Sequence, residues 1–222
     1  MSIIIAVDGT AASGKGTLAK RLARHFNFAH MDSGALYRLT ALAVLDQNGD
    51  PSNEADAVRG ARTIDLARAG DPAIRTDKVG KASSLVAAIP AVRQALYAFQ
   101  KSFLEHPPGD SLGAVMDGRD IGTVIAPDAT AKLFVDARPE VRAHRRWLEL
   151  KSLGIERNEA ELLAEIVARD HADRTRAVSP LRQAADAGLL DTSALGIDAA
   201  FAAALALVEP KVTSALKASH RG

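Results

Sequence analysis

A glycine-rich segment near the N-terminus has the spacing of a loop that binds phosphate. It reads Gly9-Thr10-Ala11-Ala12-Ser13-Gly14-Lys15-Gly16-Thr17, which is Gly-x4-Gly-Lys followed by Gly-Thr. Glycines let a backbone fold into a concave nest of N–H groups, and the N-terminus of a following helix adds partial positive charge. Lys15 supplies a mobile cation for the β- and γ-phosphates of a nucleotide. A glycine-rich turn with an exposed lysine is the alternative interpretation.

The residue after the lysine departs from the commonest form of this loop. A Ser or Thr usually stands there as a Mg²⁺ ligand, whereas this chain has Gly16, with Thr17 one position later. Asp117 follows an apolar run and is our candidate for holding the metal, through water; the alternative is a capping or turn acid. The sequence has no Asn-Lys-x-Asp guanine-binding motif, which argues against a GTPase switch.

The elements that must position these residues follow from apolar runs. Five runs predict strands, each ending in an acid or a polar turn: Ile3–Val7, Phe28–Met31, Gly113–Met116, Ala131–Val135 and Gly188–Leu190. Helices are expected over residues 15–25, 36–45, 53–69, 81–104 with a break at Pro90, 140–176 and 199–208. The alternation predicts a three-layer α/β fold with a five-stranded parallel sheet and a ligand beyond the carboxyl ends of the strands.

The composition excludes several classes of protein. The 222 residues suggest one domain, and 47% hydrophobic residues with a net charge of +1 argue against disorder and against a global attraction to nucleic acid. Cysteine is absent, which excludes disulfides, Cys-ligated zinc and thiol chemistry. The longest apolar run, Ala199–Val208, is shorter than the ~18 residues of a membrane helix, and no signal peptide precedes Asp8. We therefore expect a cytoplasmic protein.

Further segments carry a resemblance to a known family. They are Asp32–Arg38, Asp117–Thr123, Arg169–Arg176, Ser84–Arg93 and Arg142–Arg146. Together with the phosphate loop they resemble bacterial cytidylate kinase over nearly the whole chain. The resemblance implies transfer of the γ-phosphoryl group of ATP to CMP or dCMP with Mg²⁺, by a monomer. We expect no nucleic-acid partner and no membrane association.

The same resemblance divides a single kinase domain, residues 1–222, into three parts. A core takes residues 1–40, 83–144 and 160–222, a monophosphate-binding insert takes about 41–82, and a mobile lid takes about 145–159, with Gly154 as its soft point. Many relatives carry a longer insert that contains strands. Here residues 63–76 are short and have one strong turn, at Gly70-Asp71-Pro72, so we expect the additional strands to be missing.

Arginines dominate the remaining candidates, as expected where several phosphate groups meet. Their planar guanidinium grips phosphate through two hydrogen bonds, and alignment with charge neutralisation can carry phosphoryl transfer without a general base. The predicted catalytic residues are Lys15, Arg119, Arg169 and Arg174. Arg145 is predicted to bind ATP from the lid, with Arg146 and Arg142 as further candidates there. For arginines on a helix the alternative is a solvated ion pair of small value.

The acceptor base sets its own requirements. Cytosine offers one amino donor and two acceptors, N3 and O2, so a selective pocket needs a carboxylate, for which Asp120 fits, and donors for the ring. By resemblance, Asp173 and Arg169 hold the ribose hydroxyls. The predicted substrate-binding residues are Ser33, Tyr37, Arg38, Ser84, Arg93, Arg119, Asp120, Arg169, Asp173 and Arg176. For Tyr37 the alternative is core packing.

Two other functions are compatible with these residues. A kinase for UMP, AMP, dTMP or shikimate would keep the phosphate loop and change the segments after the second and third strands. A non-catalytic nucleotide sensor, or an RNA-binding module that uses the basic stripe Arg142–Arg176, would belong to another class. That stripe is interleaved with glutamates and has few aromatic residues for base stacking. We expect His30, His106 and His220 to be surface residues and Trp147 to pack at the lid hinge.

Overall fold

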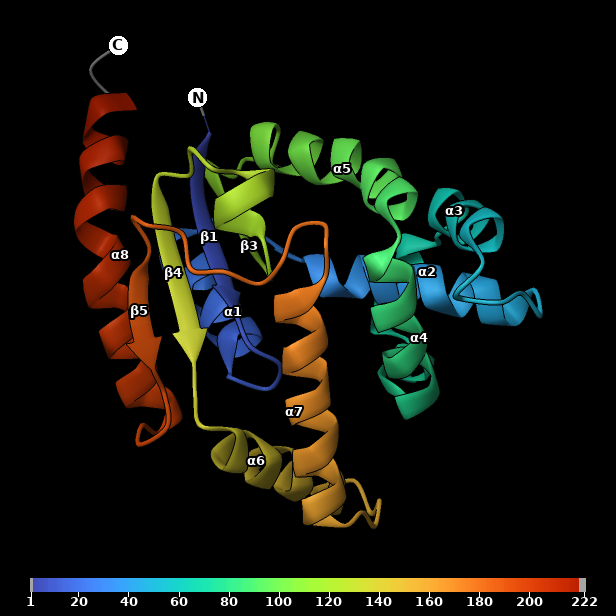
Figure 1. The fold of residues 1–222 in the computed structure, drawn as a ribbon. Coiled ribbons are helices and arrows are strands. Elements are labelled where there is room, and N and C mark those ends of the chain that lie inside the picture. The colour runs from blue at the N-terminus through green and yellow to red at the C-terminus, as the bar shows by residue number, and fades with distance from the viewer. Residues whose placement is uncertain (1, 220–222) are drawn as a thin grey trace. The chain divides into compact units, whose positions relative to one another are not determined.

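The computed structural model describes residues 2–219, which form two compact units (Figure 1). Unit 1 contains the residues up to Met31 and from Leu104 onward, and unit 2 contains Asp32–Phe103. Unit 2 therefore extends beyond both ends of the expected insert at 41–82.

Unit 1 is built on a five-stranded sheet whose strand order is β2-β3-β1-β4-β5. The strands are β1 (Ile3–Gly9), β2 (Ala29–Asp32), β3 (Gly113–Gly118), β4 (Ala131–Asp136) and β5 (Gly188–Asp191). β1 is parallel to both of its neighbours, and Ile5 pairs with Val115 on one side and Ala131 on the other. β1, β3 and β4 are almost completely buried, as their continuous apolar runs predict. The predicted α/β fold with a five-stranded parallel sheet is confirmed.

Two helices pack on one another and on this sheet, namely α1 (Lys15–Phe26) and α8 (Ile197–Ser219). Leu18 and Leu22 of α1 are buried in the main core cluster together with Ile5 and Val7 of β1. α8 contributes a stripe at four-residue spacing, Ala200, Ala204, Val208 and Val212, to the same cluster. This stripe lies on one face of the helix because 3.6 residues make one turn.

The last helix is longer than the sequence predicted. We expected a helix over 199–208 and no apolar segment of membrane length, but α8 has 23 residues and continues through Pro210. Its mean hydropathy over 18 residues is 1.4, so by length and composition it could cross a membrane. α4 and α5 would pass the same test only as one segment, which is bent by 94°. The buried stripe of α8 shows an ordinary reason for its apolar character, which is packing against the sheet.

Unit 2 is helical, and no strand begins within it among the described residues. It comprises α2 (Ser33–Asp46), α3 (Glu54–Arg62), two 3₁₀ helices η1 (Leu66–Gly70) and η2 (Pro72–Arg75), α4 (Asp77–Ala88) and most of α5 (Pro90–Glu105). α2 contacts both α3 and α4. The close approach of α3 depends on Gly60, where a β-carbon would lie 2.6 Å from Val44 Cγ2 and 2.9 Å from Thr40 O.

The helix expected over 53–69 is wrong in its second half, because α3 ends at Arg62. Thr63 Oγ1 donates to Arg59 O at 3.0 Å, and two aspartates then start new turns. Asp65 accepts from Ala67 N at 2.9 Å and Asp71 accepts from Ala73 N at 2.8 Å. Aspartate side chains compete with helix hydrogen bonds in this way and favour caps and turns.

The charged helical region expected over 140–176 forms a hairpin of two helices, α6 (Pro139–Ser152) and α7 (Glu159–Thr175). Gly154, with φ of 73°, follows α6 in the left-handed conformation that glycine adopts readily. Asn158 caps α7 by accepting from Ala160 N at 2.8 Å.

Candidate active site

The phosphate loop joins β1 to α1 (Figure 1). Its backbone is left-handed at Ala12 (φ 57°) and at Gly14 (φ 89°), so the loop bends sharply before the helix begins. A β-carbon at Gly9 would lie 2.0 Å from Val135 O, which makes glycine obligatory at that close approach. Gly14 caps α1 without a side-chain hydrogen bond. An anion at this helix N-terminus would meet backbone N–H groups that no cap side chain occupies.

Three carbonyl groups of the loop are engaged by side chains. Thr10 O accepts from Ser13 Oγ (3.0 Å) and Lys15 Nζ (3.4 Å), Ala11 O accepts from Arg142 Nη1 (3.0 Å), and Ser13 O accepts from Thr192 Oγ1 (3.0 Å). Thr10 Oγ1 in turn donates to Asp136 Oδ1 at 2.7 Å. These contacts hold the carbonyl oxygens of the loop. The backbone groups of the loop that suit a phosphate are therefore its N–H groups.

Asp117 lies at the end of β3 beside the loop. A β-carbon at Gly16 would be 3.5 Å from Asp117 Oδ2, so the carboxylate faces the position where the commoner loop has a hydroxyl. Asp117 Oδ1 lies 2.9 Å from His30 Nε2. The His30 side chain is 18% exposed, so His30 lies only partly at the surface, whereas His106 is exposed and His220 lies outside the described residues.

A divalent cation fits this place only with help from a nucleotide. Among residues 2–219 no group of three His, Asp or Glu side chains has the arrangement of a metal site. The candidate oxygen donors are the Asp117 carboxylate, which faces Gly16, and the hydroxyl of the next residue in the loop, Thr17. Mg²⁺ commonly binds through one or two carboxylates plus waters and substrate phosphates, so this donor set suits it.

Four of the predicted acceptor-site residues form one cluster, which we call the acceptor cluster: Arg119, Asp120, Asp173 and Arg176. Arg119 Nε donates to Asp173 Oδ2 at 2.7 Å across 54 positions of sequence. Arg176 lies 3.8 Å from Asp120 Oδ1 and 3.9 Å from Asp173 Oδ1. Arg119 and Asp120 follow β3, whereas Asp173 is in the last turn of α7 and Arg176 caps its C-terminus.

The arginines of the acceptor cluster favour the charged form of the Asp173 carboxylate. Burial is the largest single influence and would raise the pKa of Asp173, but the charge and hydrogen bond of Arg119 together with the charges of Arg169 and Arg176 outweigh it. The pKa of Asp173 is therefore lowered from its ordinary value. A carboxylate that is ionised at neutral pH beside several guanidinium groups suits sugar hydroxyls, which can donate to it, and the arginines suit phosphate.

Sequence reasoning missed Asp8, the residue that anchors the acceptor cluster to β1. Its Oδ1 accepts from Ile121 N at 2.8 Å and its Oδ2 accepts from Gly122 N at 2.7 Å. These bonds hold η3 (Ile121–Ile125), a single π-helical turn that directly follows Asp120. Burial raises the pKa of Asp8 to about 6, although both backbone hydrogen bonds lower it. The only signal in the sequence was an acid at the end of a strand.

The arginines of the hairpin have different surroundings. Arg142 is 2% exposed and donates to Ala137 O, Ala11 O and Asp170, so its candidacy as a cation on the lid surface is wrong. Arg145 donates to Thr192 O at 2.6 Å and to Leu195 O at 3.2 Å, in the loop after β5. Arg146 pairs with Glu149 at 2.8 Å, as an exposed helix pair does.

Arg174 lies on the phosphate-loop side of α7. Its Nη2 is 3.7 Å from Asp136 Oδ2, and Asp136 also binds Thr10 of the loop. Arg169 and Arg174 belong to the same helix, which also carries Asp173 of the acceptor cluster and contacts Asp136 near the phosphate loop through Arg174.

The remaining predicted substrate residues lie in unit 2. Tyr37 is 9% exposed, and the Arg93 guanidinium lies 5.5 Å from its ring centre. Arg38 Nη1 donates to Ile74 O at 2.9 Å, which ties α2 to η2. Ser33 is buried at the start of α2, and Ser84 Oγ donates to Gly80 O at 3.4 Å within α4.

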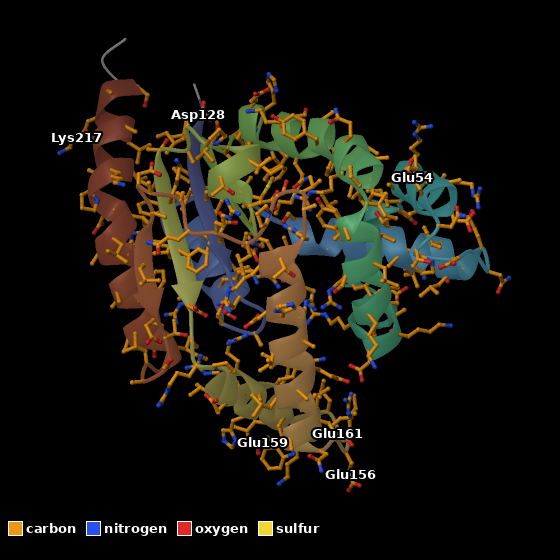
Figure 2. All side chains as sticks on the ribbon, viewed as in Figure 1. Glu54, Asp128, Glu156, Glu159, Glu161 and Lys217 are labelled. Carbon is orange, nitrogen blue, oxygen red and sulfur yellow. The ribbon has the colours of Figure 1, made fainter. Side chains whose placement is uncertain are left out.

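The tip of the hairpin is acidic, which bears on the RNA-binding alternative. Figure 2 shows Glu156, Glu159 and Glu161 at the α6–α7 turn, where all three are exposed. Trp147 stacks on His144 with ring centres 5.7 Å apart, and Lys151 lies 4.6 Å from the indole centre. Exposed carboxylates beside the aromatic residues oppose a polyanion, so the hairpin offers little support for RNA binding.

An α/β sheet with a phosphate loop after β1 and an arginine-rich cluster after β3 defines a phosphate-loop kinase of small acceptors. The cytidylate kinase family model matches residues 5–210, and the chain belongs to this family. The cytidylate kinases of Rhodopseudomonas palustris (strain TIE-1) and Afipia carboxidovorans are 55% and 54% identical to it over 207 residues. Those matches cover 93% of this chain and 96% and 97% of the relatives.

A solved structure supports the fold. An uncharacterised protein from Eubacterium ventriosum aligns over 94% of this chain and 99% of its own, with a TM-score of 0.52 and 14% identity. The reaction follows from the family: the protein is an ATP-dependent kinase that phosphorylates CMP or dCMP.

Proposed function

We propose that the phosphate loop binds ATP and that the acceptor cluster of unit 1 binds CMP or dCMP for direct transfer of the γ-phosphoryl group. The observation that carries the proposal is the Arg119–Asp173 ion pair, because it joins two separately predicted segments at 2.7 Å. A guanidinium and a charged carboxylate held together can bind the phosphate and the sugar of one nucleotide.

The proposed chemistry is alignment and charge neutralisation. An oxygen of the acceptor phosphate is already a competent nucleophile at neutral pH, so no general base is required. Lys15 and Arg174 would neutralise the donor phosphates, and Arg119 and Arg169 would neutralise the charge that develops during in-line transfer. Arg145 and the lid at about 145–159 would cover ATP and exclude water, which prevents its hydrolysis.

Mg²⁺ completes the proposed charge balance. When bound, Mg²⁺ would offset the negative charge on the oxygens of the β- and γ-phosphates. Asp117 would hold it through water, with Thr17 as the nearest loop hydroxyl. The contact between Asp117 and His30 orients the carboxylate toward Gly16.

Recognition of cytosine would depend on Asp120, which accepts the amino group, with Arg176 as a donor to the ring. Asp173 and Arg169 would hold the ribose hydroxyls. In unit 2 the proposed acceptor residues remain Ser33, Tyr37, Arg38, Ser84 and Arg93. Uracil would place a carbonyl against Asp120, and an unpaired buried polar group costs about 1–3 kcal/mol. We also propose a monomeric, cytoplasmic enzyme with no nucleic-acid or membrane partner.

The test is release of ADP from ATP and Mg²⁺ with CMP, dCMP, UMP, AMP, dTMP or no acceptor. Fast release with CMP and dCMP alone supports both the reaction and the Asp120 pocket. Release with another nucleotide instead would overturn the assignment of the base-reading residues. ATP binding without release in any reaction would place this chain among nucleotide sensors.

A further inference from the structure

A buried ion pair lies between the two helices of the hairpin and has no part in the mechanism proposed above. Arg142 of α6 and Asp170 of α7 have side chains 2% and 4% exposed, and Arg142 Nη2 lies 2.5 Å from Asp170 Oδ2. Removing two charges from water is energetically unfavourable unless their geometry and remaining hydrogen bonds compensate. The other groups that Arg142 and Asp170 contact therefore indicate what the pair contributes.

Arg142 joins three separate segments through one planar group. Its Nε donates to Ala137 O at 2.7 Å, at the end of β4, and its Nη1 donates to Ala11 O at 3.0 Å. Ala11 stands inside the phosphate loop, 131 positions earlier in the chain. The rigid fork of a guanidinium fixes the directions of its acceptors. The Arg142 cation thereby holds the Ala11 carbonyl. Because it is held, this carbonyl cannot turn toward an anionic ligand.

Asp170 connects the same contact to α7. It stands one residue after Arg169 and three before Asp173, which pairs with Arg119. Asp170 Oδ1 is buried and accepts no hydrogen bond from the described residues. The position of this carboxylate therefore depends on its bond through Oδ2 to Arg142.

We propose that Arg142 and Asp170 are positioning residues that keep the phosphate loop in the conformation that receives the β- and γ-phosphates. They act through the Ala11 carbonyl and through α7, and neither contacts a substrate. The inference rests on the proposed binding of ATP by the phosphate loop and deepens it. Its competitor is a purely structural pair that contributes to folding and leaves nucleotide affinity unchanged.

The decisive variant replaces both charges together, as Arg142→Met with Asp170→Leu. A single Arg142→Met change would leave Asp170 as a buried charge without its cation and could prevent folding. Apolar replacement of both partners of a buried pair is commonly neutral or stabilising. Arg142→Lys is the second variant, because it retains a cation for Asp170 but a single ammonium cannot span Asp170, Ala11 O and Ala137 O.

The measurements are thermal unfolding, the ADP dissociation constant by titration calorimetry, and the KM for CMP. We expect both variants to fold, with ADP bound about tenfold to a hundredfold more weakly. In Arg142→Lys, which keeps the Asp170 charge that acts on Arg119, the KM for CMP should change by less than about threefold because the Arg119–Asp173 pair is retained. Wild-type ADP affinity in either folded variant would overturn the proposal, since a structural role would leave that affinity unchanged.

A matched control exchanges another buried cation in unit 1. Lys132 is 7% exposed and donates to Pro127 O and to Asp186 at 2.9 Å, without a hydrogen bond to the phosphate loop. Lys132→Met with Asp186→Asn should therefore leave ADP affinity unchanged. Lys15→Ala separates the two proposals. Normal ADP affinity in Lys15→Ala would contradict the proposed ATP site. If Lys15→Ala loses ADP affinity while the Arg142 and Asp170 variants retain it, only the positioning role is contradicted.

Discussion

At the scale of single residues, the partners of a charged group decide what its charge can do. Arg142 and Arg119 are both predicted cations of the site, yet Arg142 donates to Ala137 O, to Ala11 O of the phosphate loop and to Asp170. Arg119 instead stands with Arg176 in a cluster at the end of β3, paired to a carboxylate. The first arrangement suits holding a loop, and the second suits binding an anion.

Lys15 is the residue whose removal should be most damaging. Lys15→Ala removes the mobile cation of the phosphate loop, and loss of one such electrostatic contact lowers kcat by about 10²–10³. Steady-state ADP release at saturating CMP measures this. Lys20→Ala, which changes an exposed lysine of the same helix, is the control and should retain full activity. Normal turnover in Lys15→Ala would contradict the assignment of this loop to ATP.

Asp120 should determine the choice between cytosine and uracil. Asp120→Ala removes the proposed acceptor for the amino group, so the preference for CMP over UMP should fall by roughly tenfold to a hundredfold, in line with about 1–3 kcal/mol. ATP affinity should change much less. The ratio of kcat/KM for the two substrates measures the effect, and Asp128→Ala, an exposed acid labelled in Figure 2, is the control. An unchanged ratio would show that another group reads the amino position.

At the scale of elements, close packing and side-chain caps determine where helices begin and end. Asp65 and Asp71 start 3₁₀ turns where a longer helix was expected. The expected absence of strands from residues 63–76 agrees with η1 and η2, which occupy most of that segment. Hydrophobic periodicity located the helices of unit 2 correctly but did not locate their ends, because those ends depend on local side-chain hydrogen bonds.

Gly60 should be essential for docking α3 on α2. Alanine improves helix propensity by about 1 kcal/mol, but its β-carbon would meet Val44 Cγ2 and Thr40 O at 2.6 and 2.9 Å. We expect Gly60→Ala to lower the free energy of unfolding by a net ~1–2 kcal/mol, because overpacking against backbone is not relieved by a rotamer change. Urea unfolding measures it. Gly70→Ala, which meets no atom within 4 Å, should be nearly neutral, and equal effects at both sites would refute this account.

At the scale of the whole molecule, stability should depend on pH through two carboxylates with opposite shifts. Burial raises the pKa of Asp8 from 3.8 to about 6, so folding binds a proton more tightly and stability falls as pH rises from 4 to 6. The pKa of Asp173 is lowered because Arg119, Arg169 and Arg176 together outweigh burial, so its contribution is present above pH 4 and is lost as pH falls further.

Asp8→Asn isolates the first of these effects. The free energy of unfolding of the wild type minus that of Asp8→Asn should decrease by about 3 kcal/mol between pH 3 and pH 7, which corresponds to the shift at 1.36 kcal/mol per pKa unit. Denaturant unfolding at several pH values gives this difference. A difference that does not vary with pH would mean that Asp8 has an ordinary pKa in the folded protein.

The sequence by itself determined the phosphate loop, the five strands and the parallel α/β class, because each follows from neighbouring residues. A continuous apolar run predicts a buried strand, and Gly-x4-Gly-Lys predicts a nest of N–H groups wherever it occurs. The acids that follow β3 and end α7 were also identified as candidates in this way.

Only the tertiary structure decided which candidates meet. The strand order β2-β3-β1-β4-β5 places His30 against Asp117 and lets Asp8 hold the turn after Asp120, although both contacts span many residues. The packing of α6 and α7 turns Arg142 inward and leaves Arg146 partly exposed, four positions along the same helix. Local spacing cannot specify such contacts, because they depend on which buried faces pair when the whole chain folds.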